Sequence, residues 1–127
     1  MCGIVGLFLK DKLLEPQLGS MLTDMLITMT DRGPDSAGIA VYGADTGGKS
    51  KLTVQSDAAG ATFTDLHAEL ETLLQTKMSL TVKDTHAVLE MSSEHIAAAR
   101  AALAAHPSNI RVMREGDTIE IYKEVGL

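Results

Sequence analysis

The spacing of apolar residues along the first 42 residues predicts a strand, a helix and a second strand. Residues 2–9 (CGIVGLFL) form a short apolar run rich in branched side chains, which predicts a strand buried on both faces. Over 14–29 the apolar residues recur at helical spacing, which predicts an amphipathic helix with a methionine-rich core face. Gly33 followed by Pro34 should end that helix. The next apolar run, 38–42, predicts another strand.

The rest of the chain alternates strand-like and helix-like segments. Strands are expected at 51–56, 79–82, 86–91, 110–113 and 118–122, and helices at 63–76 and after Ser92 and Ser93 as caps, with Ile96, Ala99 and Leu103 inward and Pro107 beyond the end. The intervening REGD is a hairpin signal for the last two strands. This order matches a split βαβ, ferredoxin-like unit with one extra strand. We therefore predict an α+β fold in which residues 50–127 form the ferredoxin-like unit.

Composition and charge narrow the class of protein. Hydrophobic residues make up 45% and charged residues 22% of the 127 residues, as in ordinary globular domains, and the scarcity of aromatics (3%) predicts an aliphatic core. A net charge of −6 without a Lys or Arg run argues against nucleic-acid or anionic-membrane partners. The apolar start is too short for a membrane span and lacks a signal peptide's basic residues. We expect a cytoplasmic protein.

The only cysteine, Cys2, directly follows the initiator methionine. It is either a small buried apolar residue or a nucleophile that becomes the N-terminus when Met1 is removed. The segment 32–36 (RGPDS) has two readings as well. It is either an ordinary turn, with local hydrogen bonds from Asp35 and Ser36, or part of a site. Each motif alone favours or allows the structural reading.

Together, the two motifs resemble the class II glutamine amidotransferases, N-terminal-nucleophile enzymes that release ammonia from glutamine. The family signature is an N-terminal Cys-Gly-Ile-x-Gly and a later Arg-Gly-x-Asp-Ser-x-Gly. Both occur in that order within residues 1–43, with Arg32 30 residues after Cys2. The resemblance implies that residues 1–49 begin an Ntn-type αββα sandwich and that residues 50–127 are inserted into it.

The resemblance also implies a mechanism and partners. Cys2 would attack the glutamine carboxamide, with the free α-amino group (pKa about 7.7–8.0) as its base. Gly3 would let substrate approach the backbone, and Arg32 would support Cys2. The supporting set is completed by Gly33, Asp35 and Ser36. L-glutamine would be the substrate and a synthase subunit or domain the ammonia acceptor in a hetero-oligomer, without a cofactor or a metal. The four histidines lack zinc-like spacing, so we expect structural or solvent-facing roles for them.

The chain departs from the family in two places. It contains neither the Gly-His-Thr-Arg segment that binds the glutamine carboxylate nor the Asn-Gly pair of the oxyanion site. We therefore expect residues 1–127 to be the N-terminal part of a longer amidotransferase, similar to the small subunit of glutamate-synthase-like enzymes, including the N-methylglutamate synthase type. Alone, the chain should hydrolyse glutamine poorly. The alternative is a non-catalytic ferredoxin-like module that binds or docks through an open sheet, with a remnant amidotransferase N-terminus.

Overall fold

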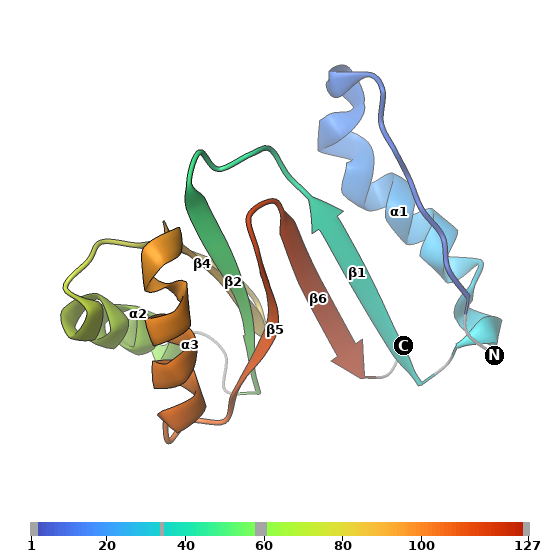
Figure 1. Cartoon of the computed structure of the whole chain (residues 1–127). Coiled ribbons are helices and arrows are strands. Elements are labelled where there is room, and N and C mark those ends of the chain that lie inside the picture. The colour runs from blue at the N-terminus through green and yellow to red at the C-terminus, as the bar shows by residue number, and fades with distance from the viewer. Residues whose placement is uncertain (1–2, 34, 58–60, 126–127) are drawn as a thin grey trace. The chain divides into compact units, whose positions relative to one another are not determined.

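A computed structural model describes residues 3–33, 35–57 and 61–125 (Figure 1). The chain separates into two compact units, Met1–Ala37 with Lys123–Leu127, and Gly38–Tyr122. Helices and two separate sheets occur in the described residues, which confirms the α+β class. The division between residues 49 and 50 and the αββα sandwich stay predictions.

The segment 3–9 forms no strand, so that prediction is wrong. It runs alongside α1 (Leu18–Ile27) in Figure 1, and its side chains are exposed or half-buried, with Ile4 92% and Phe8 84% exposed. A strand needs hydrogen bonds to a neighbouring strand, and this segment has no such neighbour among the described residues. The apolar run indicates a preference for burial, but it does not identify the strand with which the segment would pair.

The predicted helix 14–29 is divided into shorter pieces. A 3₁₀ segment, η1 (Lys12–Gln17), contains Pro16, and α1 follows it. The α-helix ends at Ile27, before the predicted stop, and a second 3₁₀ turn, η2 (Thr30–Arg32), precedes Gly33. The Thr28 hydroxyl donates to the Met25 carbonyl (2.7 Å), a local bond that competes with the continuing helix. The methionine-rich stripe is half-buried, with Leu18, Met21, Leu22, Met25 and Leu26 more protected than their neighbours.

A four-stranded antiparallel sheet forms the centre of the second unit. Its strands are β2 (Lys49–Ser56), β3 (Ser79–Lys83), β4 (His86–Ser92) and β5 (Ile110–Gly116), in the order β3-β4-β2-β5. Helix α2 (Ala61–Leu74) connects β2 to β3, and α3 (Ile96–Ala105) connects β4 to β5. Because β4 lies between β2 and β3, the arrangement is the expected split βαβ.

The main core lies between this sheet and the two helices, which cover the same face of it in Figure 1. Leu52 pairs with Leu89 across β2 and β4, and both side chains are fully buried. Side chains two residues away in a strand share a face, so Val54, Ala87 and Met91 join them. The helices contribute apolar residues at helical spacing, namely Phe63, Leu66, Leu70, Ile96, Ala99 and Leu103.

The last strand, β6 (Ile119–Val125), pairs with β1 (Ser36–Tyr42) in a separate two-stranded sheet. The predicted hairpin with β5 is therefore wrong. Asp117, in the connecting turn, accepts a hydrogen bond from the Ser50 hydroxyl (2.7 Å). This hydrogen bond connects the turn to β2. The Gly43 N–H donates to the Thr118 carbonyl (2.7 Å), where β6 begins beside the end of β1. The sequence pattern of a turn predicts where the chain changes direction, but it does not predict which strand the next strand pairs with.

The serines before α3 do not cap it. A 3₁₀ turn, η3 (Ser93–His95), precedes the helix, and no side chain caps either segment. The Ser93 hydroxyl instead bonds to the Gly48 carbonyl (3.0 Å) and to the Ser50 hydroxyl (2.7 Å). No helix within the described ranges has the length and apolarity that crossing a membrane requires.

Candidate functional site

The N-terminal segment contacts the turn that carries Arg32. A Cβ atom added to Gly3 would lie 2.3 Å from the Met29 Cε and 3.4 Å from the Arg32 Cβ. Glycine therefore allows the backbone to approach η2 closely. Cys2 lies outside the described residues, as does Pro34.

Arg32 ends η2, and its backbone N–H donates to the Met29 carbonyl (2.9 Å). The side chain is exposed. Gly33 donates its N–H to the Thr30 carbonyl (3.3 Å), and its φ of −162° is extended backbone that other residues also adopt. Backbone hydrogen bonds thus hold the turn that carries Arg32.

Asp35 and Ser36 lead from this turn into β1. Asp35 lies in a turn and Ser36 is the first residue of the strand, and both are exposed. Neither side chain hydrogen-bonds to another described residue. Among the sequence-predicted site residues, the structure places Gly3 directly against Arg32.

A second candidate site lies on the sheet face opposite the helices. Thr53, Gln55, His86 and Val88 point to this face, yet all four are buried. The Tyr122 ring of β6 packs edge-on against His86, with ring centroids 5.4 Å apart. This part of the sheet face is therefore covered.

An ion pair anchors β6 beside the covered region. Lys51 Nζ lies 2.8 Å from Glu120 Oε1, and the two side chains are only 14% and 21% exposed. The Tyr122 hydroxyl donates to Glu120 Oε2 (2.5 Å). Burial raises the pKa of Glu120, but hydrogen bonds from Lys51 and Tyr122 outweigh this effect and hold that pKa below its ordinary value. Burial, and then the Glu120 carboxylate, raise the pKa of Tyr122 well above its usual range.

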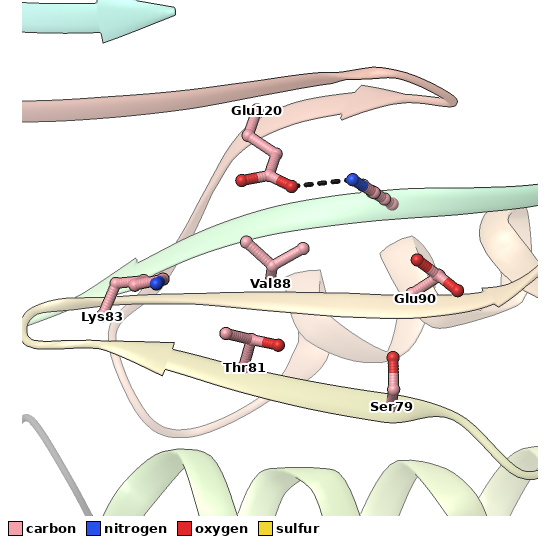
Figure 2. A pocket seen from close by; sticks show the side chains of 7 residues that line it. Ser79, Thr81, Lys83, Val88, Glu90 and Glu120 are labelled. Atoms are coloured by element: carbon pink, nitrogen blue, oxygen red, sulfur yellow. Dashed lines mark hydrogen bonds and ion pairs between the residues drawn. The ribbon is translucent and has the colours of Figure 1, made fainter. Parts of the chain in front are cut away.

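A polar groove of about 260 Å³ adjoins this ion pair (Figure 2). Its polar lining is Lys51, Ser79, Thr81, Lys83, Glu90 and Glu120, and Val88 lies among them. Sequence analysis missed this groove. The available signal was the alternation in β3, where polar residues occupy 79, 81 and 83 while Leu80 and Val82 lie between them.

The four histidines are distributed over separate parts of the second unit, where each has a local partner. Their polar partners include the Met78 carbonyl for His67 (2.8 Å), Thr85 for His86 (3.0 Å), Glu94 for His95 (3.5 Å) and Glu69 for His106 (3.0 Å). No group of three or more His, Cys, Asp or Glu side chains is arranged to hold a metal ion in the part of the chain that the structure describes.

Two curated proteins are similar to this chain. It is 56% identical, over its whole length, to the glutamine amidotransferase-like protein GlxB of Rhizobium meliloti, of which it covers 42%. It is 51% identical over 43 residues, 34% of the chain, to a putative glutamine amidotransferase of Methanothermobacter thermautotrophicus, of which it covers 14%. The chain thus spans less than half the length of either relative.

No family model matches the chain. No solved structure matches it either. Both similar proteins are named as a glutamine amidotransferase or as a protein like one.

Proposed function

We propose that this chain carries the nucleophile of a class II glutamine amidotransferase, with Cys2 as the catalytic residue. The carrying observation is the contact of Gly3 with the Arg32 turn. It brings together the two sequence motifs that resemble this class, although they lie far apart in the chain. The names of the two similar proteins support glutamine amidotransferase chemistry in general.

The proposed reaction has two steps. After Met1 removal, the Cys2 thiol transfers its proton to the α-amino group, and the sulfur attacks the glutamine carboxamide carbon. A carbon–sulfur bond forms, the carbon–nitrogen bond breaks, and the leaving amine takes a proton to depart as ammonia. Water then cleaves the thioester and yields glutamate and the free thiol. The ammonia passes to a synthase subunit or domain in a cytoplasmic hetero-oligomer.

The supporting residues act on position rather than on bonds. Gly3 gives the backbone beside Cys2 room against η2, and Arg32 supports that segment from the turn. Gly33, Asp35 and Ser36 complete the proposed supporting set because they belong to the same motif as Arg32. A loss of this geometry reduces attack by the thiol without removing it, because positioning contributes separately from the nucleophile itself.

The experiment is covalent labelling with the glutamine analogue diazo-oxo-norleucine. The Met-processed protein should take up one equivalent, and mass spectrometry should place the adduct on Cys2. The Cys2→Ala variant should lose the label, while Arg100→Ala, which alters an exposed surface pair with Glu115, should keep it. An adduct on another residue, or equal labelling of Cys2→Ala, would exclude Cys2 as the nucleophile.

A further inference from the structure

The polar groove on the second unit has the size of a small-ligand site. Its volume of about 260 Å³ is below the roughly 300–1,000 Å³ of pockets for drug-sized molecules. Residues from three strands of the sheet line it together with Glu120 of β6. Nothing in the proposed glutaminase chemistry uses these residues.

Two of the four charged groups in the groove neutralise each other. Lys51 and Glu120 form the short, mostly buried pair described above. Lys83 forms no ion pair within 4.0 Å of another described residue, although its charge also helps to lower the pKa of Glu120. Glu90 contacts Lys49 through Oε1 at 3.3 Å, and Lys49 is 58% exposed. Glu90 is 25% exposed, and solvent at the exposed Lys49 end weakens the pair. A ligand's ammonium group can therefore compete for Glu90, and a carboxylate can compete for Lys83.

These two charges lie at opposite ends of the groove (Figure 2). In the β3–β4 register, Lys83 is opposite His86 and Ser79 is opposite Glu90. Four residues of strand separate the two positions by about 13 Å, and both side chains can extend into the space between them. The Ser79 and Thr81 hydroxyls share this face and form no hydrogen bond with another described residue.

We propose that the groove binds a small zwitterionic amino carboxylate. Lys83 binds the ligand's carboxylate, Glu90 binds its ammonium group, and the Ser79 and Thr81 hydroxyls bond to its polar atoms. A simple anion meets the Glu90 carboxylate, and a simple cation meets Lys83, so neither satisfies both ends. The site is non-covalent and does not depend on Cys2.

The test compares three probes of the same chain length on the isotope-labelled 127-residue protein by NMR titration. The probe γ-aminobutyrate carries both charges, butyrate only the negative one and butylamine only the positive one. We expect saturable shifts at Ser79–Lys83 and Glu90 with γ-aminobutyrate. Each singly charged probe should bind at least about tenfold more weakly, because a hydrogen bond to a charged group is lost.

Variants test the same contacts. Lys83→Ala should weaken γ-aminobutyrate binding at least about tenfold, and Lys83→Arg should retain it. Lys77→Ala, at an exposed lysine outside the groove, is the matched control and should bind normally. Absence of saturable shifts, equal affinity for butyrate or butylamine, or normal binding by Lys83→Ala would each overturn the proposal.

Discussion

Thr53 is buried on the covered face of the sheet with an unused hydrogen-bonding group. Its side chain is 0% exposed, and its Oγ1 atom has no hydrogen-bond partner in the described structure. Placing such a group in the interior costs roughly 1–3 kcal/mol of desolvation. Val88, the register partner of Thr53 on β4, has no polar side-chain group that could bond to this hydroxyl.

We expect Thr53→Val to raise the free energy of unfolding by about 1 kcal/mol, because it replaces the unpaired hydroxyl with a methyl group of similar size. Urea denaturation measures the change. Thr81→Val makes the same chemical change at an exposed strand position and should alter stability by less than about 0.5 kcal/mol. A destabilised Thr53→Val protein would show that the hydroxyl has a partner, such as an ordered water.

The shifted pKa values of Tyr122 and Glu120 make the free energy of unfolding depend on pH. The pKa of Glu120 is lowered on folding, so its contribution is present above the ordinary value of 4.5 and is lost as pH falls through the lowered pKa. The pKa of Tyr122 is raised, so its contribution is present below the ordinary value of 10.0 and is lost as pH rises toward the raised pKa.

The Tyr122→Phe variant should therefore lose part of the decline in stability above pH 10.0. Chemical denaturation across neutral and alkaline pH measures this slope. Tyr42→Phe changes the exposed tyrosine of β1 and should keep the wild-type slope. Identical slopes in wild type and Tyr122→Phe would mean that the buried hydroxyl does not couple to folding.

At the residue scale, sequence reasoning proposed site residues where it followed a motif. Cys2, Gly3 and Arg32 came from a resemblance, and the structure places Gly3 against Arg32. Sequence reasoning did not predict the ion pair of Lys51 and Glu120, because these residues are 69 positions apart. Their pairing depends on where β6 passes, which no local pattern encodes.

At the scale of elements, the contact between the N-terminal segment and η2 depends on one small residue. The Met29 Cε can rotate away from an added Cβ, but the Arg32 Cβ belongs to the turn itself. A branched side chain at position 3 therefore needs the segment to move.

We expect Gly3→Val to displace the segment from η2 and to shift the Met29 methyl resonance in NMR spectra. Gly6→Val is the matched control, since nothing lies within 4 Å of a Cβ added there. That variant should leave the Met29 resonance in place. Equal shifts in both variants would mean that Gly3 has no special contact with the turn.

The second half of the chain was predictable element by element. A strand with alternating apolar residues, or a helix with one apolar face, can be predicted when its apolar side chains enter a single core. The elements β2, α2, β3, β4 and α3 all contribute apolar residues to one core. The errors occurred where a segment lacks such a core. Residues 3–9 remain largely exposed, and β6 pairs with a strand from far away in the sequence.

At the scale of the whole molecule, one unit contains the main core. Every residue of the main core cluster lies between Leu52 and Leu103, within Gly38–Tyr122. A compact segment with its own core can fold independently. The first unit has exposed apolar residues instead, including Ile4, Phe8 and Leu13.

We expect the excised segment Gly38–Tyr122 to unfold cooperatively. Leu89→Ala should lower its free energy of unfolding, and that of the complete chain, by about 2–5 kcal/mol, because a fully buried leucine is truncated. Leu73→Ala, at a leucine of α2 that is 65% exposed, should cost less than about 0.5 kcal/mol. A segment without a cooperative transition would show that its core needs residues from outside it.

The hydrogen bond between Gly43 and Thr118 has a consequence for how the gene can change. It joins the end of β1 to the start of β6, so the intervening residues, which include the whole four-stranded sheet, leave and return at one point. A segment with adjacent ends can be lengthened, exchanged or deleted as a cassette while the flanking strands keep their spacing. Homologous genes that differ mainly by gain, loss or replacement of this stretch are therefore compatible with a conserved β1–β6 pair.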